Sequence, residues 1–164
     1  MNILLKPPSK LEKLTNIYTQ LILEFRKIDN SKLKEHLDAW DNALSQFDSI
    51  LSQNNIPVKR SAIATGIEQG LRETPLLLQS ILPEEQRSSA LIKFKHIVEL
   101  NIPNFFDKEI KRLNKIVTCG KIKNENEWYM IRHRIDLIEG NASMTAELNL
   151  LYVLLDTYER ATAK

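Results

Sequence analysis

The apolar residues of this chain recur three and four positions apart almost throughout, which is the spacing of one face of an α-helix. Asp29-Asn30-Ser31 separates the first two such segments and supplies a turn with helix-capping side chains. The short turn predicts an antiparallel helical hairpin over residues 10–54, preceded by a flexible lead at residues 1–9. An intermolecular coiled coil through the same heptads is the alternative. The apolar positions are Leu11, Leu14, Tyr18, Leu21, Phe25 and Ile28, then Leu33, Leu37, Trp40, Leu44, Phe47 and Leu51.

A second helical hairpin is predicted over residues 120–164. Gly120 suits the position just past a helix end. Asn124 and Glu127 match a capping box that opens the next helix, and Gly140 closes that helix. The last helix should run from about Met144 to Arg160. The apolar spacing agrees, through Trp128, Ile131, Ile135 and Ile138, then Met144, Leu148, Leu151, Leu155 and Tyr158.

The central helices are predicted within residues 57–119. One helix should run from Pro57 to about Glu73 and end at the Thr74-Pro75 pair, because proline cannot donate a helical hydrogen bond. The dense apolar run that follows, Leu76 to Leu82, then predicts a short buried helix. A further helix should begin at Pro83-Glu84-Glu85 and reach about Leu100. The last central helix ends before Gly120 and should pack through Phe106, Ile110, Leu113 and Val117.

Small residues also recur four positions apart in the first central helix, at Ala62, Gly66 and Gly70. This spacing lets another helix approach closely. No segment alternates apolar and polar residues with period two, and only four glycines and six prolines are available for turns. The 164 residues suit one domain. We therefore predict an all-α, single-domain antiparallel bundle of about six to seven helices.

The amino-acid composition indicates in which cellular compartment the protein is expected. The single Cys119 excludes an internal disulfide and favours a reducing, cytoplasmic location. The opening MNILLKPPSK does not match a secretory signal, and no run approaches the about 20 apolar residues of a membrane span. Membrane partners are therefore not expected.

No catalytic or metal-binding pattern emerges from the sequence. His36, His96 and His133 lie in separate helices, and the pair His133 and Asp136 gives only two metal ligands. Cys119 sits at a predicted helix C-terminus, where the helix dipole disfavours a thiolate. No catalytic residue, metal or cofactor is assigned, although an enzyme with a site built from scattered residues remains an alternative.

Positive charge is concentrated in one part of a chain whose formal net charge is only +2. Residues 101–123 carry six Lys or Arg against two acids, and residues 124–164 carry four against seven. Four of the six cations fall on one helix face opposite the apolar positions, which predicts a solvent-exposed partner-binding surface. A solvated face whose late lysines complement the helix dipole is the alternative. The six residues are Lys108, Lys111, Arg112, Lys115, Lys121 and Lys123.

Arg134 is the one candidate for a buried charge. It falls between two apolar flanks of its helix and has no acid four residues away. We expect it to pair across helices with Glu147 or Asp156; an arginine whose charged end reaches solvent is the alternative.

Together these features predict a non-enzymatic cytoplasmic protein-binding module, such as an adaptor, a regulator or an inhibitor of one partner. A bacterial antidote or immunity protein would fit the size. An RNA or single-strand binder that uses residues 108–123 is less favoured. Glu125 and Glu127 open the helix that would read DNA in a helix-turn-helix, and they would repel the backbone. A homo-oligomer through the N-terminal heptads stays open.

Overall fold

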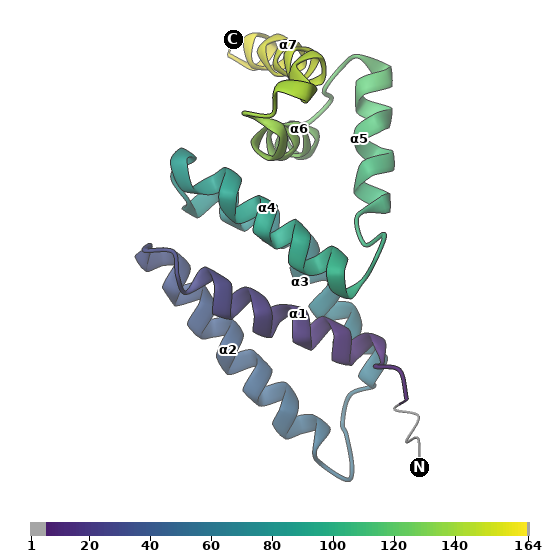
Figure 1. Cartoon of the computed structure of the whole chain (residues 1–164). Helices are drawn as coiled ribbons and strands as arrows, with labels where there is room; N and C mark the ends of the chain where they lie inside the picture. The colour runs from purple at the N-terminus through teal and green to yellow at the C-terminus, as the bar shows by residue number, and fades with distance from the viewer. Residues whose placement is uncertain (1–5, 164) are drawn as a thin grey trace.

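The computed structural model describes residues 6–163, so the predicted flexible lead at residues 1–9 lies partly outside the described residues. Within this range the chain is all-α, as predicted, and contains no strand. Figure 1 shows α1–α4 packed as one layered group, α6 and α7 stacked beyond α4, and α5 standing at the side between the two groups. The helices are α1 (Lys10–Phe25), α2 (Ser31–Leu51), α3 (Arg60–Ile81), α4 (Glu84–Asn101), α5 (Asp107–Cys119), α6 (Glu125–Ile138) and α7 (Thr145–Thr162), with a 3₁₀ turn, η1, at Ala142–Met144.

The helix ends follow capping rules that act within a few residues. Ser9 and Glu12 form a reciprocal capping box at the start of α1. The Asn124 side chain accepts a hydrogen bond from the Glu127 N–H at 3.0 Å. The Glu127 carboxylate accepts from the Lys123 N–H at 2.8 Å, one residue before the expected donor. Gly120, at φ 69°, ends α5 in the left-handed conformation that glycine adopts without strain.

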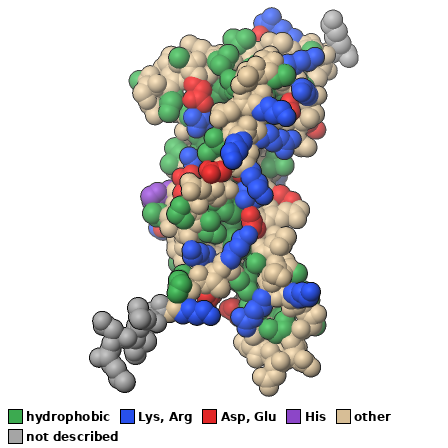
Figure 2. All heavy atoms as spheres, turned by 90° about the vertical axis from the view of Figure 1, so that its right-hand side faces the viewer, with side chains coloured by type: hydrophobic (Ala, Val, Ile, Leu, Met, Phe, Trp, Pro, Cys, Tyr) green, Lys and Arg blue, Asp and Glu red, His purple; other side chains and the backbone are tan. Residues whose placement is uncertain are grey.

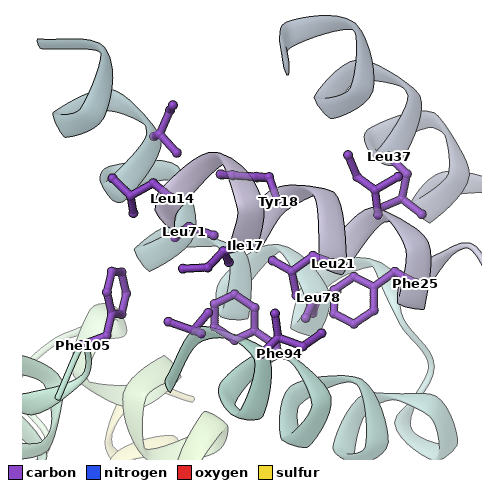
Figure 3. Packing of buried hydrophobic residues seen from close by; sticks show 14 of the residues in the cluster. Leu14, Ile17, Tyr18, Leu21, Phe25, Leu37, Leu71, Leu78, Phe94 and Phe105 are labelled. Atoms are coloured by element: carbon purple, nitrogen blue, oxygen red, sulfur yellow. The ribbon is translucent and has the colours of Figure 1, made fainter. Parts of the chain in front are cut away.

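The larger hydrophobic core surrounds α1, which contacts α2, α3 and α4. Its inner face is fully buried, and each such side chain contributes roughly 1.5–3 kcal/mol through removal from water. The second half of α2 is less covered, because only Leu33 and Leu37 of that helix are buried. Figure 3 shows core side chains from several helices packed together, among them Leu14, Ile17, Leu21 and Phe25 of α1, Leu37 of α2, Leu71 and Leu78 of α3, and Phe94 of α4.

The predicted break at Thr74-Pro75 is wrong, because α3 continues through Pro75 to Ile81. The loss of one backbone hydrogen bond disfavours proline inside a helix by about 3 kcal/mol. Buried side chains on both sides of Pro75 offset this loss, since Leu71 and Leu78 are completely inaccessible to solvent in the α1–α4 core. Tertiary packing therefore overrides the local signal.

A second, smaller core joins α5, α6 and α7 and includes Ile116, Ile131, Ile135 and Leu151. Helix α6 lies at its centre and also contacts α3 and α4. Leu137 of α6 packs against both cores. α6 is therefore the element that connects the two parts of the molecule.

Asp136 lies in the contact between α6 and the first four helices. Helical spacing puts Asp136 opposite the apolar residues Trp128, Ile131, Ile135 and Ile138, which predicts exposure to solvent, but only 2% of it is exposed. Its carboxylate accepts a hydrogen bond from Gln79 Nε2 at 3.2 Å and has Arg87 and Arg132 nitrogens at 4.0 Å. Burial raises the pKa of this carboxyl, while the hydrogen bond from Gln79 opposes the rise. The expectation failed because α3 and α4 cover a face of α6 that a two-helix hairpin would leave open.

Candidate partner-binding surface on α5

Helix α5 and the turn that follows it carry the positively charged residues that the sequence singled out. All six are exposed to solvent, and among residues 6–163 none of them takes part in an ion pair. Figure 2 views the molecule from the side of α5 and shows Lys and Arg side chains following one another over its upper part. We call Lys108, Lys111, Arg112, Lys115, Lys121 and Lys123 the basic surface.

The opposite face of α5 borders an open groove of about 660 Å³, which we call the α5 groove. Its other walls come from α3, α4 and α6, with Glu147 of α7 at one edge. Two apolar residues that were expected to be buried line it instead: Leu76 is 42% exposed and Ile110 is 44% exposed. The remaining apolar lining is Pro75, Phe94, Phe106, Leu113, Met130 and Leu137.

The groove exists because α5 is fastened near its two ends. At its start, Phe105 and Phe106 are buried in the larger core, and Arg72 of α3 donates hydrogen bonds to the Phe105 carbonyl at 3.0 Å and to Glu109 at 2.5 Å. The Arg72 guanidinium also lies 4.3 Å from the centre of the Phe105 ring, which adds a cation–π contact. Near its end, Ile116 is buried in the smaller core. The middle of α5 therefore stands away from the body.

Arg134 and Glu147 form an ion pair at the edge of the groove. Nε and Nη2 of Arg134 donate to the two carboxylate oxygens of Glu147 at 2.7 and 3.0 Å. Glu147 is one of the two partners predicted for Arg134 from the sequence. Both side chains are partly buried. The hydrogen bond from Arg134 lowers the pKa of Glu147.

His133 is a groove residue to which sequence reasoning gave no role. Burial lowers its pKa to about 4, and the nearby charges of Lys95 and Arg134 act in the same direction, so the imidazole is neutral at pH 7. Its Nδ1 atom is buried and has no hydrogen-bond partner among the described residues. A neutral imidazole at this position can donate or accept a hydrogen bond, but it carries no charge. The sequence pairs His133 only with Asp136, three residues on, and this spacing does not predict that the imidazole is buried.

The described part of the chain contains no group of three or more His, Cys, Asp or Glu residues placed to hold a metal ion. Cys119 is a free, exposed cysteine at the end of α5. Among the helices of residues 6–163, none combines the length and the apolar content needed to cross a membrane. Comparisons with protein-family models, with curated proteins and with solved structures found no match to this chain. The basic surface and the adjoining groove are thus the features from which function is argued.

Proposed function

We propose that this chain is a non-enzymatic binding protein that docks an acidic partner protein on α5. The observation that carries this proposal is the concentration of six exposed cations without ion-pair partners on one helix and the turn that follows it. The rest of the chain has a slight excess of acids, so the charge is localised rather than general. Localised charge of this kind mainly sets association rate and partner choice.

Two further features fit a regulator or inhibitor of one partner in a reducing compartment such as the cytoplasm. The chain is a small helical protein, and its one cysteine is free and exposed. Bacterial antidote and immunity proteins belong to this functional class. They neutralise a partner through surface complementarity and need no chemistry of their own.

The proposal is tested by reversing the charge of Lys111, Arg112 and Lys115 together. The Lys111→Glu, Arg112→Glu, Lys115→Glu variant should keep the wild-type melting temperature, because exposed charges contribute little to stability. It should fail to capture from a native lysate a protein that the wild type captures at low salt. With the purified partner, association should slow by about tenfold or more, with little change in dissociation.

The matched control reverses three exposed cations elsewhere, Lys32, Lys59 and Arg60, which also lack ion pairs within the described range. It changes the net charge equally and should capture the partner as the wild type does. Nuclease treatment before capture separates the two partner classes. Loss of the captured material on nuclease treatment would identify the basic surface as a nucleic-acid site instead, with affinity falling steeply in salt. Equal capture by both reversed variants would leave the basic surface as ordinary solvated surface.

A further inference from the structure

The α5 groove offers mainly apolar surface to a ligand. Its paired charged groups are already engaged: Arg72 binds Glu68 and Glu109, and Arg134 binds Glu147. Small-molecule sites usually bring together several free polar groups that fix one orientation. Its exposed large apolar side chains, Leu76 and Ile110, lie on opposite walls. Such a surface is suited to apolar side chains from a protein segment.

The size of the groove fits a helix. α5 has 13 residues and is therefore about 20 Å long. A helix with its side chains is about 10–12 Å across, so three turns, half sunk in a groove, fill roughly 700 Å³. The groove measures about 660 Å³. A partner helix of about three turns would thus cover Leu76 and Ile110 together, in the way that amphipathic helices fill grooves between helices.

The charged side chains beside the groove favour an acidic helix and one orientation of that helix. Arg112 is the one residue that belongs both to the basic surface and to the groove lining. On the α3 side, Glu73 is exposed and forms no ion pair within the described range. Acidic residues of the incoming helix are therefore favoured toward α5 and disfavoured toward α3. The other cations of α5 point away, about one helix diameter from the groove, which is close to the Debye length at physiological salt.

We propose that the α5 groove binds the apolar face of an amphipathic helix of about three turns, with its acidic flank toward Arg112. This inference rests on the proposed function, since the helix would belong to the acidic partner. Arg112 then contributes to affinity and to the preference for acids. Lys111 and Lys115 act at a distance and contribute to the association rate.

The test uses a synthetic peptide of about 14 residues, with Leu along one helical face and Glu along the adjoining flank. A side-chain lactam bridge keeps it helical, because isolated helices of this length are marginal in water. Fluorescence anisotropy of the labelled peptide should show saturable binding. A scrambled peptide of the same composition, and one with Lys in place of Glu, should bind at least about tenfold more weakly.

Two neutral substitutions test the site without altering charge. Leu76→Gln and Ile110→Gln should each weaken binding by about tenfold or more, and the double variant should abolish it. Leu100→Gln and Val153→Gln are the matched controls, because these residues are 68% and 62% exposed and lie outside the groove. Melting curves followed by circular dichroism should show all four single variants folded. Arg112→Ala should reduce the preference for Glu over Lys peptides.

The outcomes separate this inference from the proposed function. Undiminished binding by the Leu76→Gln, Ile110→Gln double variant, or no saturable binding of the acidic peptide to the wild type, would overturn the groove assignment. In the first case, loss of binding in the Lys111→Glu, Arg112→Glu, Lys115→Glu variant would still support the basic surface. In a further outcome, binding is lost in the groove variants while the Lys111→Glu, Arg112→Glu, Lys115→Glu variant associates with the partner as fast as the wild type does. That result would support the groove assignment and contradict the proposal of an acidic partner.

Discussion

His133 links the burial of one side chain to the stability of the protein. Its folded pKa is about 4, against 6.5 for an unperturbed histidine, so between these values the unfolded chain binds a proton that the folded chain does not. Stability should therefore fall as pH drops from 6.5 to 4, by up to about 3 kcal/mol. Urea unfolding across this pH window measures the free energy of unfolding of the wild type and of His133→Gln. The difference between the two free energies should shrink as the pH falls. His96→Gln, at an exposed position of α4, is the control and should retain the wild-type profile; a wild-type profile in His133→Gln would contradict the assignment.

Removing Glu147 should destabilise the protein more than removing its ion-pair partner Arg134. Glu147→Ala leaves the partly buried Arg134 guanidinium without its two acceptor oxygens, whereas Arg134→Met removes the charge and keeps apolar contact. We expect Glu147→Ala to lower the free energy of unfolding by about 1–2 kcal/mol and Arg134→Met to lower it by less. Chemical denaturation of the two variants measures this directly. Small and equal effects would show that solvent already screens the pair.

Among the elements, α1 and α3 show how a glycine of one helix leaves room for a side chain of another. A Cβ atom added at Gly70 would lie 2.6 Å from the Tyr18 hydroxyl oxygen, and Tyr18 is itself buried and in edge contact with Trp40. At Gly66, four residues earlier on α3, an added Cβ meets nothing within 4 Å. Within this Gly-x-x-x-Gly spacing, a side chain of another helix therefore fills the space beside Gly70 and not beside Gly66.

These two glycines give a matched pair of substitutions in one helix. Gly66→Ala should raise the free energy of unfolding by roughly 0.5–1 kcal/mol, because alanine favours the helical conformation. Gly70→Ala gains the same propensity but must displace Tyr18, so we expect a net loss of about 1–3 kcal/mol. Thermal melts of both variants decide the point. A stabilised Gly70→Ala protein would mean that Tyr18 moves aside easily.

At the scale of the whole molecule, Asp136 stands where the two cores meet. Asp136→Ala removes the acceptor of Gln79 and the carboxylate that lies near Arg87, while Arg132 keeps Glu84 at 4.0 Å, so we expect a loss of about 2–4 kcal/mol. Asp156→Ala, which breaks an exposed pair within α7, should change stability by no more than about 0.5 kcal/mol. Urea unfolding compares the two. Similar small losses would show that other contacts, such as those of Leu137 and the hydrogen bond from Ser88 to the Asp136 carbonyl, hold the cores together without the Asp136 carboxylate.

The sequence by itself determined the helices and most of their ends. Ser9, Asn124 and Gly120 end or begin helices through backbone groups a few residues away. Apolar residues spaced three and four positions apart form one helix face, whichever segment packs against that face. The exposed basic surface was also predictable, because a charged helix face turns to water whatever covers the other side. These signals are local, so they do not depend on how distant helices pack.

Tertiary structure decided which predicted faces are covered. Pro75 stays within α3 because residues on both sides of it are buried against α1 and α4, and Asp136 is buried because α6 has neighbours on several sides. Ile110 has the same spacing as a core residue, yet it lines a groove because anchors near both ends hold α5 away from the body. Periodicity shows that a helix has an apolar face. Only the arrangement of distant segments determines whether that face meets a neighbour or remains open to a partner.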